Sequence, residues 1–154
     1  MPWPLVEMGV SMCGPRILAI LGLLAAVGLS SGAQAKDAKQ IQLDLNALQD
    51  SDKGCIGVFV LKNALGQDVA KLGIRIASFS PDGHVSPLTT LSVAPFATNK
   101  TRVVTALLTS AQPCSRVGRV LVDSVSVCDG DGLDPGMCGG MLSLSTHAAV
   151  SLDY

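Results

Sequence analysis

The sequence predicts an all-β domain, a seven-stranded antiparallel immunoglobulin-like sandwich with two disulfides, preceded by a cleavable signal peptide. Three observations lead to this prediction. Short segments alternate apolar and polar residues, turn residues separate them, and an apolar leader precedes a region that holds four cysteines. No convincing helical period occurs after the leader. We therefore expect two parts, a signal peptide at 1–35 and a single β-sandwich domain at 36–154.

The leader is an apolar run, Ile17 to Leu29, that follows Arg16. It is shorter than the roughly 20 residues that a membrane-spanning helix needs. It is followed by Ala33 and Ala35, the small-residue pattern that signal peptidase accepts, so we expect cleavage before Lys36. No membrane anchor is expected to remain after cleavage.

The start site and the export route are left open by the sequence. Met12 directly precedes the charged start of the leader and is an alternative initiation site that would leave the mature chain unchanged. General secretion is favoured over the twin-arginine route, since paired arginines are absent from the leader. Either route delivers a periplasmic or secreted protein to an oxidising compartment, where cysteines form disulfides.

The first three strands are predicted from their apolar patterns. From residue 40, apolar residues alternate with polar ones as in a strand with one buried face: Ile41, Leu43, Leu45 and Ala47. The segment 55–61 is apolar on both faces, which indicates a central strand. In the third strand Leu72, Ile74 and Ile76 share one face.

The last four strands follow the same logic. The segment 85–97 is β-like around Thr89 to Val93, and its prolines Pro87 and Pro95 favour a sheet edge because proline lacks a ladder donor. Thr101 to Ser110 is the fifth strand. Val117 to Val127 is the sixth, with a bulge expected near Asp123 and Ser124 because its valines change phase there. Leu142 to Leu152 alternates cleanly as the seventh.

Strand geometry selects the disulfides Cys55 to Cys114 and Cys128 to Cys138. Cys114 and Cys128 bracket the sixth strand, which would hold them roughly 40 Å apart, whereas bonded cysteines need Cα atoms within about 7 Å. The seventh strand is expected to run back antiparallel and to bring Cys138 to Cys128. Cys55 and Cys114 both stand at strand starts, which share the opposite end of the sandwich in an alternating strand order.

Three segments carry a resemblance to a known group. They are 43–48, 118–125 and the loop from Cys128 to Cys138 with 142–146 after it. They resemble small uncharacterised exported, periplasmic proteins of alphaproteobacteria, often labelled as Tat-pathway-signal-domain or hypothetical proteins. The resemblance implies a Gram-negative periplasm and brings no activity with it. This chain departs from the label because it lacks twin arginines.

The loop between Cys128 and Cys138 is a weak calcium candidate. It holds three carboxylates among glycines, Asp129, Asp131 and Asp134, and calcium prefers such oxygen-rich flexible loops. Alignment with an EF-hand loop puts Val127 and Cys138 at the two end-ligand positions, so the cage lacks both end ligands. We therefore favour a solvated loop closed by its cysteines, with no metal and no cofactor.

Catalytic patterns are missing from the sequence after the leader. His84 and His147 stand without neighbouring clusters, the only glutamate is Glu7, and no serine elbow or Cys-x-x-Cys occurs. The nearly balanced charge offers no basic field for nucleic acid. We expect a periplasmic binding or scaffolding protein and not an enzyme, with another envelope or periplasmic protein as its partner. The alternatives are a self-associating envelope structural subunit and an enzyme whose site the sequence does not reveal.

Overall fold

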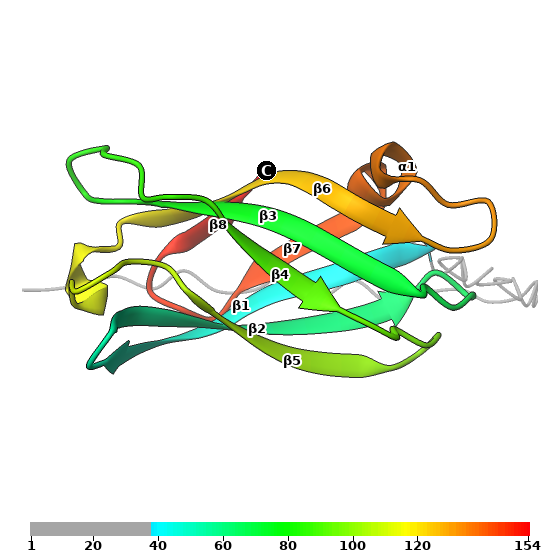
Figure 1. The fold of residues 1–154 in the computed structure, drawn as a ribbon, viewed down its shortest axis with the longest axis horizontal. Helices are drawn as coiled ribbons and strands as arrows, with labels where there is room; N and C mark the ends of the chain where they lie inside the picture. Colours follow the sequence, from blue (N-terminus) through cyan, green and yellow to red (C-terminus); the bar gives the residue numbers. More distant parts are fainter. Residues whose placement is uncertain (1–37) are drawn as a thin grey trace, which may run out of the picture. The chain divides into compact units, whose positions relative to one another are not determined.

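The computed structural model describes residues 38–154, which belong to one compact unit. The expected cleavage site at Ala33, Ala35 and Lys36 lies outside the described residues. The described part forms eight strands, a 3-10 turn and a short helix (Figure 1). In chain order these are β1 (Gln40–Ser51), β2 (Gly54–Ala64), β3 (Lys71–Phe79), β4 (Thr89–Val93), β5 (Thr101–Leu107), η1 (Cys114–Arg116), β6 (Arg119–Asp129), α1 (Pro135–Gly140), β7 (Leu142–Thr146) and β8 (Ser151–Asp153).

The strands build two four-stranded sheets that enclose one core. The first sheet has the order β5-β2-β1-β7 and the second the order β4-β3-β6-β8. Figure 1 shows the two sheets as layers, with η1 at one end and α1 at the other. The disulfides are Cys55 to Cys114 and Cys128 to Cys138. The predictions of an all-β sandwich and of both cysteine pairs are confirmed.

The core is filled from both sheets in the phase that the alternation predicts. In β1 and β3 six of the predicted inward side chains are fully buried: Ile41, Leu43, Leu45, Leu72, Ile74 and Ile76. The prediction for Ala47 is corrected, since a bulge at Asn46 shifts the phase of β1, so that Ala47 is half-buried and Leu48 packs against the core. Phe59 on β2 and Phe96 after β4 are the largest buried side chains. As expected, β2 lies centrally in its sheet and β4 lies at a sheet edge.

Two bulges set the phase of β6 against β3. The register skips Asp123 and then Ser126, so that Val122, Val125 and Cys128 all point inward. The bulge predicted near Asp123 and Ser124 is therefore present. The second bulge corrects the prediction for Val127, which is half-buried because the extra residue passes the inward position to Cys128.

The strand count and direction differ from the prediction of seven antiparallel strands. The predicted last strand divides: β7 pairs with β1, and β8 pairs with β6 in the other sheet, and both pairs are parallel. The chain crosses between sheets at 147–150, where the backbone N–H groups of His147 and Ala148 donate to Leu45 O at 3.0 and 3.2 Å. Since both sheets face the same core, one inward phase serves both halves, and alternation alone does not reveal the crossing.

A short helix, α1, stands where the sequence shows no helical period. The Asp134 side chain caps it by accepting a 2.9 Å hydrogen bond from the Met137 N–H, and Pro135 occupies the start of the helix. An acidic cap followed by proline is a common helix start, so local capping outweighs the lack of periodicity. Within the described residues, no helix has the length and apolar character to cross a membrane.

Candidate binding surface

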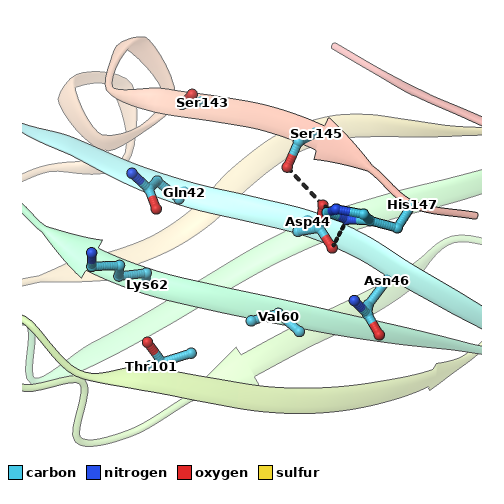
Figure 2. A pocket seen from close by; sticks show the side chains of 9 residues that line it. All are labelled: Gln42, Asp44, Asn46, Val60, Lys62, Thr101, Ser143, Ser145 and His147. Atoms are coloured by element: carbon cyan, nitrogen blue, oxygen red, sulfur yellow. Dashed lines mark hydrogen bonds and ion pairs between the residues drawn. The ribbon is translucent and has the colours of Figure 1, made fainter.

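The outer face of the first sheet carries a shallow groove. Its side chains alternate outward along neighbouring strands, and the register sets Gln42 of β1 opposite Lys62 of β2 and Ser143 of β7. The groove has a volume of about 470 Å³ (Figure 2). It is lined by Gln42, Asp44, Asn46, Val60, Lys62, Thr101, Ser143, Ser145 and His147. Four strands and the crossing after β7 thus supply one polar surface.

Asp44 is the central group of the groove. Its carboxylate accepts a 2.7 Å hydrogen bond from Ser145 Oγ and lies 2.9 Å from His147 Nδ1 (Figure 2). The Asp44 side chain is 14 % exposed and that of His147 is 73 % exposed. The carboxylate is thus held inside the groove while the imidazole faces solvent.

The electrostatics of this cluster favour an ionised Asp44. Partial burial raises the pKa of the Asp44 carboxyl, but the hydrogen bonds with Ser145 and His147 and the charge of His147 together outweigh it, so that its pKa lies below the ordinary value. An ionised carboxylate accepts hydrogen bonds and attracts cations. Lys62 lines the same groove, so the surface offers both charges to a ligand.

The geometry of Asp44, Ser145 and His147 differs from that of a serine nucleophile with its base. In such a triad the hydroxyl donates to the imidazole, and the carboxylate orients the imidazole from the other side. Here the hydroxyl and the imidazole both contact the same carboxylate. The arrangement therefore holds His147 against β1 and directs the Ser145 hydroxyl at the carboxylate instead of at the imidazole.

An apolar strip lies beside the polar groove. On β2 the outward side chains of Ile56, Val58 and Val60 are half-buried. On β5, Val103 is 65 % exposed and stands opposite Val60, while Leu107 is exposed and stands opposite Ile56. The second strand is thus apolar on both faces, as its sequence indicates, although one of these faces looks outward. A surface that joins apolar side chains to oriented polar groups is suited to binding.

The calcium candidates do not form a cage. Asp134 caps α1, and Asp131 accepts a hydrogen bond from Gln67 through its backbone oxygen. Asp129 ends β6 next to the disulfide-bonded Cys128. In the part of the chain described by the structure, no three His, Cys, Asp or Glu side chains gather in a way that could hold a metal ion.

The two histidines lie in different surroundings. His84 is exposed in the turn after β3, where its Nε2 lies 3.5 Å from an Asp82 carboxylate oxygen. His147 joins the groove, although the sequence shows no cluster around it. Its partner Asp44 is 103 positions away in the chain, so the pair forms only because β7 lies beside β1. The alternation in the sequence predicts that Asp44 and His147 both point outward, but it does not show that their two segments are neighbours in the sheet.

Comparison with known proteins gives no relative from which an activity could be transferred: no family model, no curated protein and no solved structure matches the chain significantly. The site is therefore interpreted from its own geometry. The two disulfides of the chain are typical of proteins that fold in oxidising, non-cytoplasmic compartments.

Proposed function

We propose that this chain is a periplasmic binding or scaffolding protein that recognises another envelope or periplasmic protein through the outer face of the sheet β5-β2-β1-β7. One observation carries the proposal: on that face, a polar groove centred on Asp44 lies directly beside the apolar strip of Val58, Val60 and Val103. Protein interfaces combine such apolar centres with polar rims that supply hydrogen bonds.

The compartment is inferred from the cysteines and from the sequence before residue 36. Both cysteine pairs are oxidised in the structure, and the apolar leader ends in a pattern that signal peptidase accepts. The resemblance to exported proteins of alphaproteobacteria points to the same place. Export to a periplasm explains these observations together, and intact-mass measurement of the exported protein should give a chain that begins at Lys36.

We extend the proposal to the architecture, which is immunoglobulin-like in the broad sense. Immunoglobulin domains keep their first, second and fifth strands in one sheet and their third and sixth in the other. Here β1, β2 and β5 share the first sheet, and β3 and β6 share the second. Two strands depart from that arrangement, because β4 pairs with β3 in the second sheet and β7 pairs with β1 in the first. Loops and sheet faces of such sandwiches serve many binding functions, so the face chemistry decides the role.

A matched pair of charge reversals tests the role. Lys62→Glu changes the groove, whereas Lys71→Glu changes a lysine that is also exposed, on β3 in the other sheet. We expect chemical crosslinking in the native envelope to capture a defined partner with the wild type and with Lys71→Glu, and the yield of that partner to fall strongly with Lys62→Glu. Equal capture by all three proteins would refute the groove as the binding surface.

An enzyme screen tests the alternative class. We expect no turnover of generic ester, peptide, phosphate or glycoside substrates by the purified protein, because Ser145 donates to Asp44 and not to the imidazole of His147. Turnover that disappears in His147→Ala or Asp44→Asn would overturn the binding role and would make the same groove an active site.

A further inference from the structure

The open edge of the first sheet is the free side of β5. The strand β5 is the longest of the four edge strands, with seven residues against five in β4, five in β7 and three in β8. Prolines flank β4, at Pro87 and Pro95, whereas β5 contains none. Natural proteins shorten their edge strands or place proline there, because an unpaired edge is a template for another strand.

The hydrogen-bond phase of β5 shows which backbone groups face the open side. At the two ends of the ladder, Asn63 N–H donates to Lys100 O at 3.0 Å and Leu108 N–H donates to Cys55 O at 2.8 Å. Antiparallel residues bond to a given neighbour in alternation, so the even-numbered residues of β5 face β2. The backbone groups of Thr101, Val103, Thr105 and Leu107 therefore point away from β2. Within residues 38–154, no strand pairs with that side.

We propose that two copies of this chain pair antiparallel along β5, with Val104 on the two-fold axis, to form one continuous eight-stranded sheet. This register pairs all seven residues of β5, from Thr101 opposite Leu107 to Leu107 opposite Thr101. Val103 then stands opposite Thr105 of the second copy. The odd-numbered residues meet odd-numbered residues, so each open N–H and C=O group meets its complement.

Charge also favours a second copy in the antiparallel direction. The start of β5 is basic, with Lys100, Arg102 and the neighbouring Lys62. The other end lies beside the β1–β2 turn, since Ala111 N–H donates to Lys53 O, and this turn is acidic on balance, with Asp50 and Asp52 against Lys53. Two-fold pairing brings the basic end of each copy toward the acidic end of the other. A parallel pairing would bring like charges together.

The side chains of β5 fit the same occupant. Arg102 donates to Pro95 O within its own chain at 3.3 Å, so its guanidinium already has a partner beside the edge. The outward side chain of Val103 is 65 % exposed and would be covered in part by the second copy. Edge pairing buries less than the roughly 1,600 Å² of a standard interface, so the expected dimer is reversible and depends on concentration.

The pairing goes beyond the proposed function because it requires no partner other than the chain itself. It would place the two grooves on one continuous sheet face, since Val103 lies beside Val60 of the groove in each copy. A bivalent surface binds a repeated or clustered partner more tightly than a single groove does. The pairing is tested by the purified protein alone, whereas the groove is tested by partner capture with Lys62→Glu. Failure of one proposal is therefore distinguishable from failure of the other.

Sedimentation of the purified exported protein, from micromolar to near-millimolar concentration, tests the pairing. We expect a monomer that converts to a dimer. Thr105→Pro removes an N–H group that only the dimer uses, so the monomer should stay folded while the dimer dissociates roughly 30-fold more readily. Thr105→Val keeps that N–H group and should keep the dimer. A monomer at every concentration, or equal dimerisation of both variants, would overturn the proposal.

Amide hydrogen exchange resolves which edge is used, even if Thr105→Pro proves unstable. The amides of Arg102, Val104 and Ala106 should be protected at all concentrations, because they bond to β2. Those of Val103 and Thr105 should become protected only where the dimer forms. A dimer in which Val103 and Thr105 exchange freely would use another surface and would refute β5 pairing. A partner that binds the β5 edge of a strictly monomeric protein would refute it as well.

Discussion

The central strand β2 is fastened differently at its two ends. At its start, Cys55 is bonded covalently to Cys114, and the Cys55 N–H donates to the buried Thr109 hydroxyl at 3.1 Å. Near its end, Asn63 is held by hydrogen bonds alone. Its side-chain amide donates to Gln67 O at 3.0 Å and to Phe96 O at 2.8 Å. We call these the Cys55 end and the Asn63 end.

The two ends stabilise the fold through different states of the chain. The disulfide at the Cys55 end spans 59 positions, so it acts mainly by restricting the unfolded chain. Asn63 is fully buried, and its hydrogen bonds join the turn after β2 to the segment after β4. It acts in the native state, because its removal would leave buried polar groups without partners. Four experiments can break or sharpen this contrast.

The largest effect is expected at the Cys55 end. The double substitution Cys55→Ala and Cys114→Ala should lower the free energy of unfolding by about 4 kcal/mol on the chain-entropy model. Urea denaturation followed by circular dichroism measures it. Because removal of the disulfide lets the unfolded chain expand, the free energy of unfolding should also fall more steeply with urea concentration. A loss below that of the Cys128 and Cys138 double substitution would contradict the argument from loop length.

The next effect is expected at the Asn63 end. Asn63→Ala removes the amide contacts to Gln67 O and Phe96 O, and also the Leu65 N–H donation to Asn63 Oδ1 at 3.0 Å. At about 1 kcal/mol for each broken bond, the loss should be about 3 kcal/mol, with the denaturant slope unchanged. Gln49→Ala, at an exposed position of β1, is the control and should change stability by less than about 0.5 kcal/mol. Equal losses of stability in the two variants would show that the buried hydrogen bonds of Asn63 do not stabilise the fold.

The contrast between the ends also separates what the sequence could predict from what it could not. Both cysteine pairs followed from strand direction, because the pairing depends only on which end of the sandwich each cysteine occupies. The bulge near Asp123 followed from a phase change among valines. The role of Asn63 could not be predicted, since nothing local in the sequence shows that its amide reaches Phe96, 33 positions away.

The candidate site was hidden for a similar reason. The alternation of β1 and of the last segment gave the outward phase of Asp44 and His147, but the groove requires β7 to lie beside β1. The sequence predicts one antiparallel strand at 142–152, whereas the chain enters both sheets through β7 and β8. Which sheet a strand joins depends on long-range packing, and an inward phase is compatible with either sheet.

A smaller effect is expected from the second disulfide, which lies at the same end of the sandwich as Asn63. Cys128 and Cys138 are only 10 positions apart, so the chain-entropy model gives about 2.7 kcal/mol for Cys128→Ala with Cys138→Ala. Thermal unfolding measures this loss. Hydrogen exchange should quicken in α1, which carries Cys138, and stay unchanged in β2. Faster exchange throughout both sheets would show that this link supports the whole sandwich instead of one loop.

The smallest effect is expected from the Asp44 and His147 pair, and it should depend on pH. The pKa of Asp44 lies below its ordinary value because its hydrogen bonds with Ser145 and His147 outweigh burial. A carboxyl whose pKa is lowered by folding stabilises the protein above its unfolded pKa, near pH 4, and this contribution is lost as the pH falls through the lower, folded pKa. The exposed imidazole is screened by solvent, so we expect less than about 1 kcal/mol. The free energies of unfolding of the wild type and of Asp44→Asn should therefore differ above pH 4 and converge in stronger acid. His147→Gln should keep part of the stability advantage over Asp44→Asn, because the Ser145 hydrogen bond to Asp44 remains. A wild-type advantage that grows in stronger acid would contradict a lowered pKa of Asp44.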